Sequence, residues 1–430
     1  MNKKTVRDVD VKGKRVLVRC DFNVPLDEQG RITDDTRIRA ALPTIQYLMQ
    51  NGAKVVLCSH LGRPKGEVKE EYSLKPVAEE LTELLDTDVK FATDVVGNSA
   101  KEASEGLKEG EVALLENVRF DPREEKNDDT LSMELASLSD GIYVNDAFGA
   151  AHRAHSSTAG VAEHVDEAVA GFLMEKEVEF LSGTLEDPDQ PFVAIIGGKK
   201  VSDKIGVLEN LIDKVDEILI GGGMAFTFLK AKGYDIGDSI CEEDKIKEAK
   251  RIMDKAEEKG VKITLPKDVR VSKEFSNDTP DKIVESTQIP EGYQGLDIGP
   301  KTCREFAQEI SQANTILWNG PLGVCEFPKY AIGTQQIAMV VGNTTKEGAV
   351  SVIGGGDSVA AIKKLGLSEK EEKESFTHIS TGGGASLELL EGKELPGVAC
   401  LTNKKEKNID KEEGISKKQC QCKKNEERGI

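Results

Sequence analysis

Apolar, strand-like runs alternate with helical patterns twice along this chain, and this alternation is the strongest constraint on its fold. In the first half the apolar runs are RVLVRCDF, AKVVLCSH, EVALLENVRF and GIYVNDAF, and in the second half PFVAIIGG, EILIGGG, VKITLPKDVRV, TILWNGP, AVSVIGGG and FTHISTGGG. Such alternation is typical of parallel, doubly wound α/β sheets. Because 430 residues exceed what one ordinary core holds, we predict two such domains.

The two patterns are joined by residues 165–187, for which the periodicity predicts one long helix. Leu173, Met174, Val178 and Leu181 fall on its apolar face,. We interpret this helix as the domain connector. The alternative is a core helix of either domain.

A glycine-rich turn lies within residues 349–365, AVSVIGGGDSVAAIKKL. A strand, three glycines and a helix start in this order create an anion site, because the helix's free N–H groups face a phosphate. Asp357 and Ser358 stand where we expect the helix N-cap. Asp357 is also a candidate ligand for a metal ion that travels with the phosphate. The alternative is a tight turn without a ligand.

Four strand-like runs of the second half end in glycines, at 197–198, 221–223, 354–356 and 382–384. After the first of these, Lys200 and Lys204 are four residues apart with Asp203 between them. We expect both ammonium groups on one face of the first helical turn, above a phosphate chain; an ordinary surface face is the alternative. Walker A and GxGxxG patterns are both missing from the sequence, which disfavours P-loop NTPases and dinucleotide dehydrogenases,.

Basic residues follow the predicted strands of the first half. Since ligands bind beyond the carboxyl ends of parallel strands, we expect one basic pocket there, formed by Arg19, Arg37, His60, Arg63, Arg119, His152, Arg153 and His155. Asp21 and Asn23 would orient hydroxyl groups or the arginines. Arginine forks in a protein of net charge −19 suit a small multivalent anion,.

The same acidic charge argues against nucleic acid as a partner,. Eight scattered cysteines without a CxxC pair indicate reduced thiols,. The N-terminus lacks the apolar run of a signal peptide, and no stretch approaches membrane-spanning length. We therefore expect a cytoplasmic protein without a membrane partner.

From about residue 5 to residue 402 the chain resembles the phosphoglycerate kinase family. The motifs that carry the resemblance are RVLVRCDFNVP, TRIRAALPTI, SHLGRP, ENVRF, NDAFGAAHRAHSS, GGKKVSDKI, WNGPLGVCEF, IGGGDS and STGGGASLELLEG. The resemblance implies two domains of similar size with a cleft between them. These are a phosphoglycerate-binding domain at 1–171, a nucleotide-binding domain at 172–388 that begins with the connector helix, and a segment at 389–402 that returns to the first domain.

The resemblance also implies residue roles. The triose acid would be held by Asp21, Asn23, Arg37, His60, Leu61, Gly62, Arg63, Arg119 and Arg153. The nucleotide would be held by Gly198, Lys200, Asp203, Lys204, Gly221, Asn319, Glu326, Gly354, Gly355, Gly356, Asp357 and Ser358, with Glu326 at the ribose and Asp357 at Mg²⁺. Catalysis would involve Arg37, Lys200, Gly356 and Gly383.

The implied reaction is reversible, Mg²⁺-dependent phosphoryl transfer between 1,3-bisphosphoglycerate and ADP, which gives 3-phosphoglycerate and ATP in a hinge-bending monomer. The alternatives are a two-lobed binding protein for an anionic metabolite and a nicotinamide-dependent oxidoreductase. Lys199, Cys325 and Ser358 depart from the common family pattern, and we expect them to affect only nucleotide affinity.

The tail at 403–430 lies outside the resemblance. It is highly charged and nearly devoid of large apolar residues, which predicts disorder. Its Cys420 and Cys422 offer only two ligands to a soft metal.

Overall fold

The first of the two predicted sheets has six parallel strands. Their spatial order is β3 (Val89–Phe91), β4 (Val112–Leu114), β2 (Lys54–Cys58), β1 (Arg15–Arg19), β5 (Ile142–Asn145) and β6 (Glu167–Ala170). Side chains alternate between two hydrophobic clusters, since Leu17 belongs to one cluster and its neighbours Val16 and Val18 to the other. Helices thus cover both faces, as a parallel sheet requires. They are α1 (Thr36–Gln50), α2 (Lys75–Leu85), α3 (Asn98–Glu105) and α4 (Asp129–Ala136).

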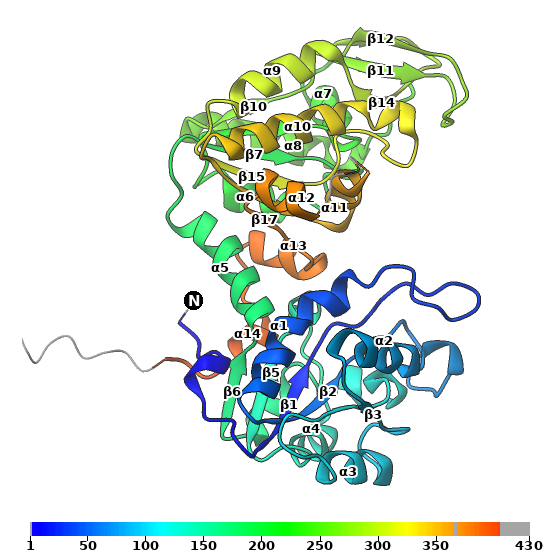
Figure 1. The fold of residues 1–430 in the computed structure, drawn as a ribbon. Coiled ribbons are helices and arrows are strands. Elements are labelled where there is room, and N and C mark those ends of the chain that lie inside the picture. Colours follow the sequence, from blue (N-terminus) through cyan, green and yellow to red (C-terminus); the bar gives the residue numbers. More distant parts are fainter. Residues whose placement is uncertain (1, 365, 367–368, 405–430) are drawn as a thin grey trace, which may run out of the picture.

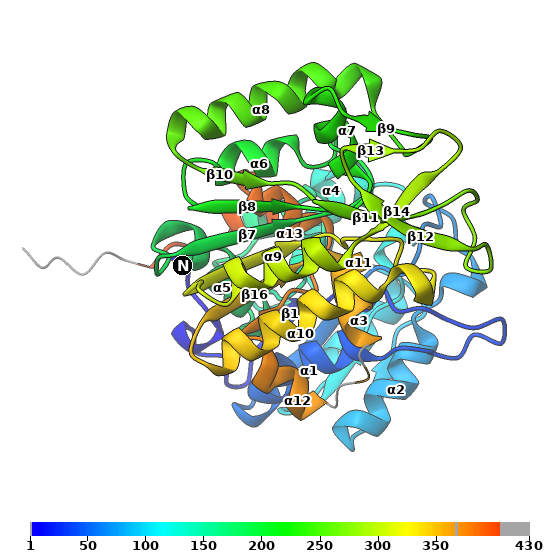
Figure 2. The same ribbon diagram turned by 90° about the horizontal axis from the view of Figure 1, so that it is seen from above.

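The second sheet also has six parallel strands. Their order is β10 (Lys262–Thr264), β8 (Glu217–Ile220), β7 (Phe192–Ile196), β15 (Thr315–Asn319), β16 (Val350–Gly354) and β17 (His378–Ile379). The helices that accompany it are α6 (Ile205–Leu211), α7 (Met224–Ala231), α8 (Ile246–Lys259), α9 (Pro300–Ile310), α10 (Ile332–Lys346), α11 (Gly356–Lys363) and α12 (Glu369–Ser375). This computed structural model describes residues 2–364, 366 and 369–404. The predicted fold class, two doubly wound parallel sheets, is confirmed (Figures 1 and 2).

The run 261–271, predicted as one strand of the second parallel sheet, instead contributes a strand to each of two sheets. Lys262–Thr264 is the edge strand β10, whereas β11 (Asp268–Ser272) pairs antiparallel with β12 (Asp281–Glu285) and β14 (Gln294–Ile298). Pro266 separates the two strands, and proline has no N–H to continue a ladder. A two-stranded pair, β9 (Asp235–Ile236) and β13 (Gln288–Ile289), lies beside this small sheet.

The prediction of one helix over 165–187 is wrong at its start. Residues 167–170 form strand β6, which pairs with β5 through Val144 and Val169, and helix α5 (Phe172–Glu186) begins only after Gly171. Parallel pairing of a short apolar segment has overridden helical periodicity. The buried carboxylate of Asp146, just beyond β5, accepts hydrogen bonds from the N–H groups of Leu173 (2.9 Å) and Met174 (3.2 Å). The first sheet therefore holds the N-terminus of α5.

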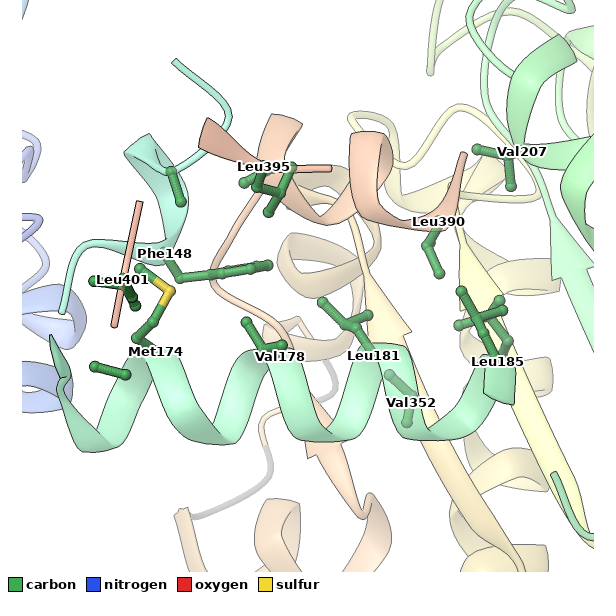
Figure 3. Packing of buried hydrophobic residues seen from close by; sticks show 14 of the residues in the cluster. Phe148, Met174, Val178, Leu181, Leu185, Val207, Val352, Leu390, Leu395 and Leu401 are labelled. Atoms are coloured by element: carbon green, nitrogen blue, oxygen red, sulfur yellow. The ribbon is translucent and has the colours of Figure 1, made fainter. Parts of the chain in front are cut away.

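Helix α5 runs between the two sheets (Figure 1). Met174, Val178 and Leu181 are buried on one face, as predicted, whereas Leu173 is only half-buried. Figure 3 shows this face, with Leu185, turned towards Leu390 and Leu395. These two leucines belong to α13 (Gly384–Leu390) and to the segment before α14 (Pro396–Ala399). One hydrophobic cluster thus extends from the first sheet through α5 to the second.

The segment after α14 lies against the first sheet. The N–H of Thr402 donates to the carbonyl of Ala168 (2.8 Å), and the N–H of Lys4 donates to the carbonyl of Thr402 (2.8 Å). Of the predicted charged tail only residues 403 and 404 are described, so its disorder and the pair Cys420 and Cys422 lie outside the described residues. Among the described helices none is both long and apolar enough to cross a membrane.

The packing of α5 yields a stability prediction. Leu181→Ala removes a side chain that is fully buried in the cluster, so we expect the free energy of unfolding to fall by about 2–5 kcal/mol. Urea denaturation followed by circular dichroism measures this loss. The control is Glu179→Ala, on the exposed side of the same helix, which should change stability by less than about 0.5 kcal/mol. Equal effects of both variants would contradict the packing described.

Candidate active site

Arg37 lies beyond the carboxyl end of β1, where it faces Asp21 and Asn23. Its Nη1 donates to both carboxylate oxygens of Asp21 (3.1 and 3.2 Å) and to the carbonyl of Asn23 (3.2 Å). The side-chain oxygen of Asn23 accepts from the N–H of Gly62 (2.9 Å). The structure thus brings residues from three separate predicted motifs to one edge.

Arg119 and His60 lie at the same edge and are buried. Arg119 Nη1 donates to the carbonyl of Gly62 (2.8 Å). Burial, and then the positive charges of Arg19, Arg119, Arg37 and Arg153 in decreasing order, hold the pKa of His60 well below its usual range. The positive charges of these four arginines disfavour the protonated form of this imidazole,.

The same arginine charges also lower the pKa values of two more histidines. Burial followed by Arg119, Arg19 and Arg153 lowers the pKa of His155 to about 4. Burial followed by Arg153 also lowers the pKa of His152, whose Nε2 accepts from Arg153 Nε (3.2 Å). These imidazoles are neutral at pH 7, so the positive potential of the edge comes from arginines alone.

The remaining predicted substrate residues differ in their surroundings. Leu61 is buried, and its N–H donates to Asn117 Oδ1 (3.2 Å). Gly62 has φ +62°, and a Cβ there would lie 2.4 Å from the Tyr72 ring, so this tight turn requires glycine,. Arg63 is exposed, and no hydrogen bond or ion pair between described residues joins it to the cluster.

A cavity of about 500 Å³ opens beside the second sheet. Three residues predicted for the nucleotide, Gly198, Glu326 and Asp357, contribute to its wall, as does Lys199. Most of the wall is apolar and was not predicted: Ala225, Phe226, Ile240, Phe275, Leu296, Leu322, Val324 and Ala361. Apolar residues that line a cavity have the same sequence pattern as core residues, so the sequence carried no signal for them.

A buried carboxyl in this wall, Asp297, was also missed. Its Oδ2 accepts from the N–H of Gly333 (2.8 Å), and burial raises its pKa to about 8. Burial therefore favours the uncharged form of Asp297, and the backbone N–H groups of Gly333 and Ile298 oppose this effect.

The glycine turns of the second sheet serve two purposes. A Cβ on Gly197 would lie 2.2 Å from the carbonyl oxygen of Pro321, and one on Gly221 would lie 2.5 Å from Leu322 Cδ2. These two glycines permit close packing within the protein. By contrast, a Cβ on Gly356 or Gly383 would meet no atom within 4 Å. The space beside Gly356 and Gly383 leaves backbone open to a ligand.

Lys200 and Lys204 do not share a helical face, and that prediction is wrong. Helix α6 begins at Ile205, because residues 198–204 form an irregular turn. Lys204 is half-buried and its Nζ donates to Asn319 Oδ1, whereas Lys200 is exposed and lies near Glu242. Asp203 is exposed and lies near Lys204.

Asn319 lies beneath the turn 354–356. Its Nδ2 is buried without a hydrogen-bond partner among the described residues, and a Cβ on Gly354 or Gly355 would lie 3.2 or 3.3 Å from it. Because buried donors are nearly always paired, this amide indicates that a ligand oxygen completes the site.

The capping role expected of Asp357 and Ser358 is wrong. Gly355, with φ +90°, is the N-cap of α11, and Asp357 lies exposed in the first turn. The Ser358 hydroxyl instead accepts from the N–H of Gly320 (2.7 Å) and ties α11 to the end of β15. Cys325, which like Ser358 departs from the common family pattern, is buried, and its thiol donates to Thr334 Oγ1 (3.3 Å). The six described cysteines are free.

An ion pair and a hydrogen bond join the second half of the chain to the first near these edges. Lys363 Nζ contacts Asp34 Oδ2 (2.9 Å) and Thr36 Oγ1 (3.2 Å), so α11 reaches the start of α1. The hydrogen bonds from Thr36 and Lys363 lower the pKa of Asp34 to about 2. At the second sheet, the buried Glu177 of α5 accepts from His378 Nε2 (2.8 Å) of β17 and from the N–H of Thr381 (2.8 Å).

Comparison with known proteins identifies the relatives of this architecture. The family model described as phosphoglycerate kinase matches residues 6–393. A phosphoglycerate kinase of Clostridium tetani is 56% identical over 405 residues, which cover 94% of this chain and 98% of the relative. That of Chloroflexus aggregans is 57% identical over 403 residues, or 93% and 99% of the two chains.

Solved structures agree with these sequence matches. The phosphoglycerate kinase from Coxiella burnetii superposes with a TM-score of 0.84 at 42% identity, covering 93% of this chain and 98% of its own. The enzyme from Pyrococcus horikoshii gives 0.78 at 35% identity, with the same coverage. The chain belongs to the phosphoglycerate kinase family.

Proposed function

We propose that this protein transfers a phosphoryl group reversibly between 1,3-bisphosphoglycerate and ADP, which gives 3-phosphoglycerate and ATP. The observation that carries the proposal is the presence of two unlike sites, one at each sheet. An arginine-rich edge that suits a small anion lies at the first sheet, and a cavity with an apolar wall and an open glycine turn lies at the second. As a member of this family the protein is a glycolytic kinase, which sets aside the binding-protein and oxidoreductase alternatives.

The arginine edge binds the triose acid in this proposal. Arg37, Arg119 and Arg153 grip its carboxylate and phosphate oxygens through paired N–H groups, while Asp21 and Asn23 orient Arg37 and the hydroxyl group. His60, Leu61 and Gly62 shape the wall. Arg63 joins them from the exposed side.

The cavity binds the nucleotide in this proposal. Its apolar wall accepts the adenine, Glu326 accepts hydrogen bonds from the ribose, and the phosphates lie on the N–H groups of Gly354–Gly356. Lys200, Asp203, Lys204, Asn319 and Ser358 complete the phosphate site, with Gly198 and Gly221 beneath the nucleotide.

The residues present fit a nucleotide-borne Mg²⁺. No cluster of three or more His, Cys, Asp or Glu among the described residues could hold a metal alone. Asp357 supplies one exposed carboxylate at the cavity, near the ammonium of Lys204. Mg²⁺ is commonly bound by one or two carboxylates together with substrate phosphates and water. When bound, it offsets the phosphate charge.

The chemistry requires no general base, because both nucleophiles, a phosphate oxygen of ADP and the substrate carboxylate, are already anionic. Catalysis then consists of positioning and of stabilising charge on the transferring group. We assign that charge stabilisation to Arg37 and Lys200 and to the N–H groups of Gly356 and Gly383. The neutral histidines are consistent with this, since none supplies the positive charge.

Closure of the cleft brings the two sites together and excludes water. We place the boundaries at 1–171 and 172–388, with α5 as connector and 389–402 packed against the first domain. The protein acts as a cytoplasmic monomer without a nucleic-acid or membrane partner.

A coupled assay tests this function. Protein, ADP and 1,3-bisphosphoglycerate should yield ATP when Mg²⁺ is present, and the yield should collapse on chelation with EDTA. Replacement of ADP by NAD⁺ is the control. ATP formation that fails with Mg²⁺ would refute the proposal.

Arg37→Ala should lower kcat by about 10²–10³-fold, because it removes a positive charge opposite the transferring group. Steady-state kinetics with both substrates measures the effect. Arg39→Ala is a matched control on the same helix, where the exposed Arg39 pairs with Asp35 (2.6 Å). An unchanged kcat in the Arg37 variant would show that its guanidinium has no catalytic role.

Lys204→Ala should lower kcat by roughly 10²-fold and also weaken nucleotide binding, because it removes a cation and leaves Asn319 without its partner,. Calorimetric titration with Mg-ADP measures binding apart from turnover. Lys250→Ala, on the exposed face of α8, should behave like the unaltered protein. Wild-type affinity in the Lys204 variant would place the phosphates elsewhere.

A further inference from the structure

We infer that Glu124, Ser157 and Arg19 are positioning residues that hold His60 as a neutral hydrogen-bond donor to the acid substrate. The inference rests on the proposed function and adds residues to it. All four side chains are buried. They come from different parts of the chain, and a continuous series of hydrogen bonds joins them.

The series begins at the fully buried carboxylate of Glu124, in the short helix η4 (Glu124–Lys126). Its Oε2 accepts from the N–H of Ser157 (3.0 Å) and its Oε1 from the Ser157 hydroxyl (2.5 Å). The hydroxyl proton is thereby directed at the carboxylate. The oxygen of Ser157 is then free to accept, and Arg19 Nε donates to it (2.8 Å).

Arg19 passes this orientation on to His60. With Nε held by Ser157 and Nη1 donating to the carbonyl of Cys20, the guanidinium plane is fixed. Its Nη2 lies 3.3 Å from His60 Nδ1. Arginine has only donors, so Nδ1 must accept, and a neutral imidazole then carries its proton on Nε2. No hydrogen bond among the described residues uses Nε2, which remains available to a ligand oxygen.

The charges around His60 favour the same state. Arg19 of β1, Arg37 of α1, Arg119 of η3 (Val118–Phe120) and Arg153 of the loop after η5 (Phe148–Ala150) all disfavour an imidazolium. Burial raises the pKa of Glu124, whereas Arg19, the hydrogen bonds from Ser157 and then Arg119 favour its carboxylate form. A neutral donor at Nε2 recognises a carboxylate, phosphate or hydroxyl oxygen without adding a charge that the cluster would repel.

The test uses Glu124→Gln and the milder Ser157→Ala in the full-length protein. Glutamine replaces one of the two carboxylate oxygens that accept from Ser157 by an NH2 donor,, and alanine removes the relay to Arg19. Each variant should raise the KM for 3-phosphoglycerate and its calorimetric Kd roughly tenfold, as expected when buried polar groups lose partners. The KM for Mg-ATP should stay unchanged.

Nitrogen-15 NMR of histidine-labelled protein reads the tautomer directly and without turnover. In the unaltered protein His60, assigned with the variant His60→Gln, should show an unprotonated Nδ1 and a protonated Nε2. Both relay variants should move these signals towards the average of exchanging tautomers.

Matched controls lie at the opposite edge of the same sheet. Asp140→Asn removes the carboxylate that pairs with Arg15 (2.7 Å) at the start of β1, and Ser139→Ala removes a buried hydroxyl that donates to Ala136 (2.8 Å). Neither control should alter the 3-phosphoglycerate KM or the His60 signals.

Wild-type His60 signals in both relay variants would overturn the inference, as would an equal rise in both KM values. Failure of the proposed function is distinguishable, because it would abolish ATP formation by the unaltered protein while its His60 tautomer remained as described.

Discussion

The geometry of parallel strands is the constraint on which the rest of this structure depends. Each parallel sheet gathers all its carboxyl ends at one edge, so each sheet offers one place for a ligand. The two sheets of this chain therefore offer two such places. Helix α5 connects the two sheets, since Asp146 holds its N-terminus at the first sheet while its apolar face packs on α13 near the second.

The arginine edge carries an electrostatic cost that its neighbours offset. Arginines that lie close together repel one another, and burial removes the water that would screen them. Asp21 pairs with Arg37, Glu124 faces Arg19, and the histidines stay neutral. Enough positive charge remains unpaired to attract a multivalent anion. An anionic ligand would thus balance the positive charge that the protein leaves unpaired.

Much of this architecture could be predicted from the sequence because strand and helix patterns are local. The order of strands along the chain was enough to predict that Arg37, His60 and Arg119 share one edge of the sheet. The prediction failed where long-range contacts decide. Pairing with β5 made residues 167–170 a strand, and the irregular turn after Gly198 separated Lys200 from Lys204. Glu124 stands in the charged run 121–129, whose composition indicates an exposed surface, yet it is fully buried.

The contact between Lys363 and Asp34 has a consequence for the resting molecule. Both side chains are more than two-fifths exposed, 43% and 42%, and such surface pairs contribute about 0–1 kcal/mol. A free energy in that range changes the equilibrium constant for forming the contact between Lys363 and Asp34 by at most about fivefold. The pair therefore contributes little to the stability of the contact between α11 and the start of α1. Because salt screens it, the contribution of this pair to the contact between α11 and the start of α1 falls as the ionic strength of the surroundings rises.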